Sequence, residues 1–181
     1  MTPYRIFVEK KKPFRLEAES LKNDLNSNLG LNIKDLRLIS VYDLFGFTPE
    51  LLERSSARVF GEPATDVVSL NIDYDDKPFL GIEALPGQFD QRAAAAEECV
   101  KLIQPDADIS IRSGKLLIFD KDVSKSDIDK IAKYVINAVE ARKKDMSKLE
   151  APGYANAKTV EILDGFRDIS PANAEAFCKK M

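Results

Sequence analysis

Two segments of the chain begin with the same kind of helix cap and continue with the same spacing of apolar residues. Thr48 begins one of them, and Ser124, with an acidic residue three positions later, begins the other. Ser124 lies 76 positions after Thr48, and Val135 lies 76 positions after Val59. The offset is too long for a solenoid repeat and only two copies occur, so it predicts a tandem duplication folded as a pseudo-twofold pair.

Each half is predicted to form a ferredoxin-like unit of the βαββαβ type or a closely related one. Alternating and helical spacings of apolar residues predict the secondary structure. The expected strands cover residues 4–8, 36–41, 67–71 and 79–85, the expected helices cover 18–29, 48–59, 91–103 and 128–136, and a hairpin covers 109–119 with its turn at Ser113 and Gly114. The predicted fold class is α+β, a mainly antiparallel sheet with helices on one face.

One duplicated domain is expected over residues 1–144, with halves at about 1–76 and 77–144. Beyond it, Pro152, Gly153 and the small polar residues that follow predict a linker over 145–181. Ser170 and Pro171 then open a new helix near the end of the sequence. We therefore expect the chain to continue past Met181 into further domains.

Composition argues against several classes of function. A formal net charge of -3 provides no basic field for nucleic acid. The chain has no histidine, which removes Ser-His and Cys-His nucleophile pairs and imidazole metal ligands, so we predict no catalytic residue and no metal site. No secretory leader and no membrane-spanning apolar run is recognisable, so a cytoplasmic protein without membrane contact is expected. Cys99 is expected to be buried beside Ala95, Leu102 and Ile103.

The segment from Leu85 to Cys99 carries the candidate functional residues. A Pro-Gly pair ends the preceding strand, and Asp90 is placed to cap the helix that follows. Three polar side chains, Gln88, Gln91 and Arg92, then lie at a helix N-terminus, a position that favours anions. The guanidinium of Arg92 adds two-pronged recognition of phosphate or carboxylate. The alternative interpretation is a capped helix with a solvated first turn.

This segment resembles the start of the large, single-chain phosphoribosylformylglycinamidine synthases (FGAM synthases), glutamine-dependent enzymes of purine biosynthesis. Further matches follow the same order along nearly the whole chain. They lie at residues 4–11, at 36–38 with Tyr42, Asp43 and Gly46, at 59–63, and at 134–142. The chain departs from the family pattern at Ser40, Val41, Ala94, Ala95 and Ala138.

The resemblance implies a non-catalytic N-terminal domain built like two fused copies of a small accessory subunit. Its partners would be the synthetase and glutaminase domains of the same chain, and ATP and magnesium would bind only in those missing parts. Gln88, Asp90, Gln91 and Arg92 would then dock against the synthetase domain or shape the ammonia path. The alternative function is a free-standing regulatory domain that binds a small molecule, since ferredoxin-like pairs also serve that purpose.

Overall fold

The computed structural model describes residues 2–149, 169–171 and 174. Within them, six strands form one sheet in the order β3-β1-β2-β5-β4-β6, and every neighbouring pair is antiparallel. The strands are β1 (Tyr4–Lys10), β2 (Leu36–Phe45), β3 (Asp66–Ser69), β4 (Phe79–Ala84), β5 (Ser110–Phe119) and β6 (Ala141–Lys143). The helices are α1 (Leu16–Leu29), α2 (Pro49–Ser55), α3 (Gln91–Ile103) and α4 (Lys125–Val135), with a 3-10 turn η1 (Lys12–Phe14) and a π-helical turn η2 (Ser56–Phe60).

The expected helix caps are confirmed. Thr48 accepts a hydrogen bond from the Leu51 amide at the start of α2. Ser124 and Asp127 form a reciprocal capping box at the start of α4, and Gly30 ends α1 in the left-handed conformation. The helix expected over residues 48–59 does extend to Val59, but its last turn, η2, is π-helical.

Elements follow one another in the same order in both halves of the sheet. From the central β2/β5 pair outwards, the strand order is β2-β1-β3 on one side and β5-β4-β6 on the other. Matching elements begin 74 to 76 residues apart; the pairs of first residues are 4 and 79, 16 and 91, 36 and 110, 49 and 125, and 66 and 141. This order is the one that a pseudo-twofold axis through the β2/β5 pair would produce, and superposition of the halves remains a prediction.

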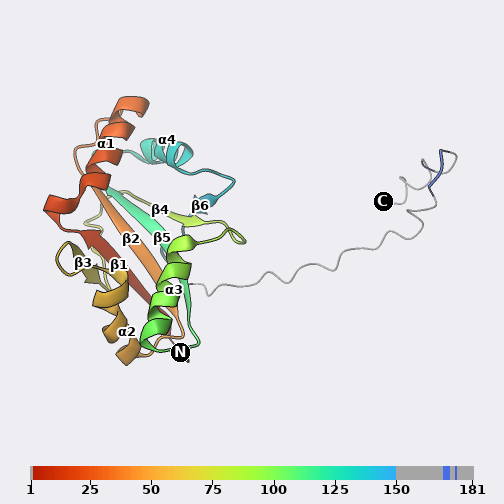
Figure 1. The fold of residues 1–181 in the computed structure, drawn as a ribbon. Coiled ribbons are helices and arrows are strands. Elements are labelled where there is room, and N and C mark those ends of the chain that lie inside the picture. Colours follow the sequence, from red (N-terminus) through yellow and green to blue (C-terminus); the bar gives the residue numbers. More distant parts are fainter. Residues whose placement is uncertain (1, 150–168, 172–173, 175–181) are drawn as a thin grey trace.

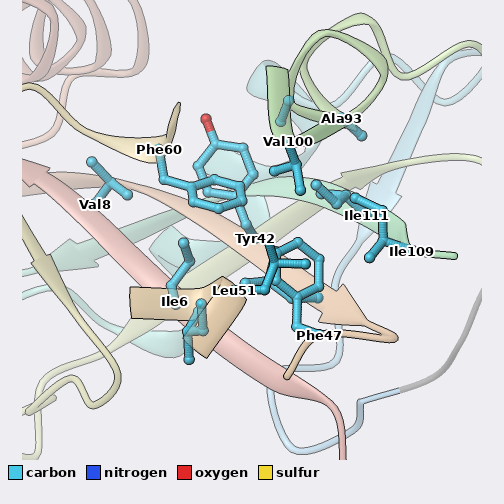
Figure 2. Close-up of a cluster of buried hydrophobic side chains, with 13 residues drawn as sticks. Ile6, Val8, Tyr42, Phe47, Leu51, Phe60, Ala93, Val100, Ile109 and Ile111 are labelled. Atoms are coloured by element: carbon cyan, nitrogen blue, oxygen red, sulfur yellow. The ribbon is translucent and has the colours of Figure 1, made fainter. Parts of the chain in front are cut away.

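Helices α1, α2, α3 and α4 all cover one face of the sheet, as expected (Figure 1). Two apolar clusters lie beneath them, and each cluster contains one helix from each half. The first packs α2 and α3 against β1, β2 and the start of β5, with Tyr42, Phe47 and Phe60 at its centre (Figure 2). The second packs α1 and α4 through Leu25 and Ile131. Neither half therefore has a core of its own on this face.

The opposite face is covered by loops. Phe7, Ile39, Val41, Leu116 and Ile118 form its apolar centre, against which Ile72, Tyr74 and Met146 pack. Residues 145–149 were expected to belong to the linker, but Met146 among them packs against the sheet. Most of the remaining expected linker lies outside the described residues; within the described part, the amide of Ala174 donates to the carbonyl of Ser170.

Three local expectations are wrong. Residues 110–119 form one continuous strand, paired with β2 along its whole length, and there is no turn at Ser113 and Gly114. Each described half accordingly has three strands, in a βαβαβ order. Cys99 is exposed and Leu102 is 85% exposed, because the buried face of α3 is Ala93, Ala96 and Val100.

Candidate functional site

Asp90 joins the start of α3 to the middle of β5. Its carboxylate accepts the Ala93 amide at 2.9 Å, which is the expected N-cap bond. It also accepts the amide and the hydroxyl of Ser113, each at 2.8 Å. The carboxylate of Asp90 is therefore itself the anion at this helix N-terminus.

The other three candidate residues lie around this cap without converging on one point. Gln88 donates from its side-chain amide to the carbonyl of Val139 at 3.2 Å, which joins the loop after β4 to the loop before β6. Arg92 points across to β2 and donates to Ser40 Oγ at 2.7 Å. Gln91 is exposed in the first turn.

Arg92 and Ser40 have counterparts in the other half. Lys115 forms an ion pair with Glu17 at 2.9 Å, and these two residues lie 75 positions from Ser40 and Arg92 respectively. A helix-to-strand contact thus occurs at both sets of positions. One is an ion pair, and the other joins a guanidinium to a neutral hydroxyl. Within the described residues, Arg92 pairs with no carboxylate.

A hollow of about 450 Å³ lies beside Arg92. Residues of β4, the 88–92 segment, the centre of β5 and the start of β6 line it. Phe89 at its edge is 80% exposed, and Val139 on the neighbouring loop is 74% exposed. The lining combines side-chain amides and apolar surface with charged groups of both signs, those of Arg92, Lys115, Glu83, Asp90 and Glu140.

Sequence reasoning missed a second group of charged residues, on the face away from the helices. Lys144 is buried and forms ion pairs with Asp43 at 2.7 Å and Glu83 at 2.9 Å. Arg5 pairs with Asp43, and Arg142 pairs with Glu83. Although burial acts to raise it, the hydrogen bonds and charges of Lys144 and Arg142 hold the pKa of Glu83 below its ordinary value. For Arg5, Asp43 and Glu83, the signal was alternation with apolar neighbours along the strands. Arg142 and Lys144 lie in a run of charged residues and gave no such signal.

No group of three or more Cys, Asp or Glu side chains in the described part of the chain is placed to hold a metal ion. No helix among the described residues is long and apolar enough to cross a membrane.

Comparisons with known proteins found no matching family model, no matching curated protein and no matching solved structure.

Proposed function

We propose that this chain is the non-catalytic N-terminal domain of an FGAM synthase, the ATP- and glutamine-dependent ligase that amidates formylglycinamide ribonucleotide in purine biosynthesis. In this role the domain acts in the cytoplasm, holds the synthetase and glutaminase domains together and helps to contain ammonia. ATP and magnesium belong to those other domains.

The repeated strand order is the observation that carries the proposal. The ordered sequence resemblance implies two accessory-subunit-like units in one chain. A fusion of two such units across a central antiparallel strand pair would have the order β2-β1-β3 beside β5-β4-β6 found here. Each helix-side core also contains one helix from each half, as expected if the two halves were once the subunits of a dimer.

The segment around α3 has the chemistry of a docking edge. Gln91 is exposed, Phe89 is 80% exposed, and Arg92 lacks an acidic partner within the described part of the chain. An interface commonly combines an aromatic side chain, an arginine and polar groups at its rim. We assign this edge to contact with the synthetase domain or to the wall of the ammonia path.

The most direct test of the proposed FGAM synthase identity is to sequence the gene beyond the codon for Met181. We expect codons after Met181 to encode a synthetase region that contains histidine, followed by a glutaminase. Purified residues 1–181 are expected neither to hydrolyse glutamine nor to cleave ATP. A reading frame that ends shortly after Met181 would contradict the proposal and favour the free-standing ligand-binding alternative.

A further inference from the structure

A charged cavity of about 220 Å³ opens on the face of the sheet away from the helices. Its lining residues share one property, a charged side chain. They are Asp43, Glu83, Arg112, Arg142, Lys143, Lys144, Asp145 and Lys148. Strand register explains the grouping, because Asp43 lies directly opposite Arg5 on one side and Arg112 on the other, and Glu83 lies opposite Arg142. Residues paired in this way project from the same face of a sheet.

The floor of the cavity is made by Lys144 lying across two glycines. A Cβ at Gly81 would come within 3.2 Å of Lys144 Cβ, and a Cβ at Gly114 would come within 3.1 Å of Lys144 Cδ. The missing side chains let the Lys144 stem cross the sheet, so that its ammonium reaches both Asp43 and Glu83. The side chain of Lys144 is only 4% exposed. The cavity is therefore held by a buried ion-pair network.

Positive charge is in excess in this network. Four cations, Arg5, Arg112, Arg142 and Lys144, surround two carboxylates, those of Asp43 and Glu83. The remaining lining charges are paired among themselves or elsewhere: Lys143 with Asp129 on α4, and Lys148 with Asp145.

Among these four cations, Arg112 is the one for which the described part of the chain provides no acceptor. It is half-buried and lines the cavity, and within the described residues no hydrogen bond or ion pair is formed by its guanidinium. Both neighbouring carboxylates are already engaged, Asp43 by Arg5 and Lys144, and Glu83 by Lys144 and Arg142. A guanidinium placed so presents its paired N–H groups to a ligand from solvent.

We propose that this cavity binds the phosphate group of a small phosphomonoester or of inorganic phosphate. Arg112 provides the main two-pronged contact, and Arg142 and Lys144 supply further positive charge. The excess of two positive charges matches a phosphate dianion, and about 220 Å³ accommodates a phosphate with a short substituent. This site lies on the opposite face of the sheet from Arg92 and does not depend on the proposed function.

The test is titration of purified, isotope-labelled protein with inorganic phosphate and, separately, with glycerol 3-phosphate, followed by amide chemical shifts at constant ionic strength. We expect saturable shifts at Arg112, Arg142 and Lys144. Arg112→Gln is expected to weaken binding by about tenfold, and Arg112→Lys by less, because lysine keeps the charge but loses the fork. The control is Arg58→Gln, an exposed arginine in the π-helical turn that makes the same change in net charge.

Saturable binding of both anions that Arg112→Gln weakens and Arg58→Gln does not would support the site. Binding of inorganic phosphate alone, with the same dependence on Arg112, would also support it and would restrict the ligand to the free ion. Equal weakening in both variants, which means an adventitious ion only, would overturn the proposal. The proposal would also be overturned if neither anion bound saturably to wild-type protein that circular dichroism shows to be folded.

Discussion

At the scale of single residues, Asp90 has the largest structural role in the candidate segment. One carboxylate caps α3 and also receives two hydrogen bonds from Ser113 on β5. Arg92, two positions later, makes one hydrogen bond to a hydroxyl from an exposed position. Asp90 is therefore held by three hydrogen bonds within the domain, whereas Gln88 and Arg92 make one side-chain hydrogen bond each and Gln91 is exposed.

Replacement of Asp90 by alanine should lower the free energy of unfolding by about 1–3 kcal/mol, because the helix loses its cap and the Ser113 groups lose their acceptor. Urea denaturation followed by circular dichroism measures the change. Gln91→Ala, at the neighbouring exposed position, is the control and should change the free energy by less than about 0.5 kcal/mol. Equal effects of the two substitutions would show that the cap is unimportant.

Sequence pattern predicted the cap at Asp90 correctly but placed the buried face of α3 wrongly. Ala93–Ala96 are four alanines in succession, so side-chain size gives no signal for which of them faces the sheet. The contacts of Arg92 with Ser40 and of Asp90 with Ser113 join residues 52 and 23 positions apart. Such contacts depend on strand register, which local spacing does not determine.

At the scale of elements, close packing explains why a glycine, Gly114, lies inside a continuous strand where the sequence predicted a hairpin turn. A Ser-Gly pair between apolar runs is typical of a turn, but glycine within a strand also marks a close approach of other groups. A Cβ on Gly114 would lie 2.8 Å from the carbonyl oxygen of Ile82 on β4. The glycine is required by the neighbouring strand and by Lys144, which only the assembled sheet brings near it.

Gly114→Ala should therefore destabilise the protein by about 1–3 kcal/mol, since β4 and Lys144 must shift to admit the methyl group. Ser110→Ala, at a half-buried position of the same strand, is a control for the effect of alanine in β5. Thermal denaturation of both variants measures the difference. A Gly114→Ala protein as stable as the wild type would mean that Lys144 does not lie across the sheet as described.

The ion pairs of Glu83 predict how stability depends on pH. Despite the opposing effect of burial, Lys144 and Arg142 lower the pKa of Glu83 in the folded protein from its ordinary value of 4.5. A carboxylate with a lowered folded pKa contributes stability that is fully present above the unfolded pKa and is lost as the pH falls through the folded pKa. The loss should therefore occur below about pH 4.5.

We expect Glu83→Gln to be clearly less stable than the wild type at pH 7 and the difference to shrink on acidification below about pH 4.5. Denaturant titrations at pH 7 and at several acidic values measure it. Glu98→Gln, on the exposed side of α3, is the control and should change the free energy of unfolding by less than about 0.5 kcal/mol at neutral pH. A Glu83→Gln difference that does not depend on pH would contradict the role given to the ion pairs.

At the scale of the whole molecule, the two halves are joined by shared cores and by their central strands. Each helix-side core contains one helix from either half, and the central strands β2 and β5 pair over ten residues. The offset of two helix caps predicted the repeat in element order. It did not predict that the helices exchange partners, because that depends on how the two halves pack together.

Residues 1–76 and 77–149, expressed separately, should each lack a cooperative unfolding transition, since neither retains a complete core. The whole chain should unfold in one transition that coincides by near- and far-ultraviolet circular dichroism. A cooperative transition in either half alone would contradict the shared cores.

We propose that this domain supports an amidation that it does not itself catalyse, and the rate of that amidation with two nitrogen sources is its most direct test. In the full-length enzyme, Arg92→Ala should lower synthesis from glutamine more than synthesis from added ammonia, because it disturbs docking or the ammonia path and leaves the synthetase site intact. The change should alter the domain's own free energy of unfolding by less than about 1 kcal/mol, and Arg58→Ala should leave both rates unchanged. Equal loss with both nitrogen sources, or no loss with either, would contradict the account.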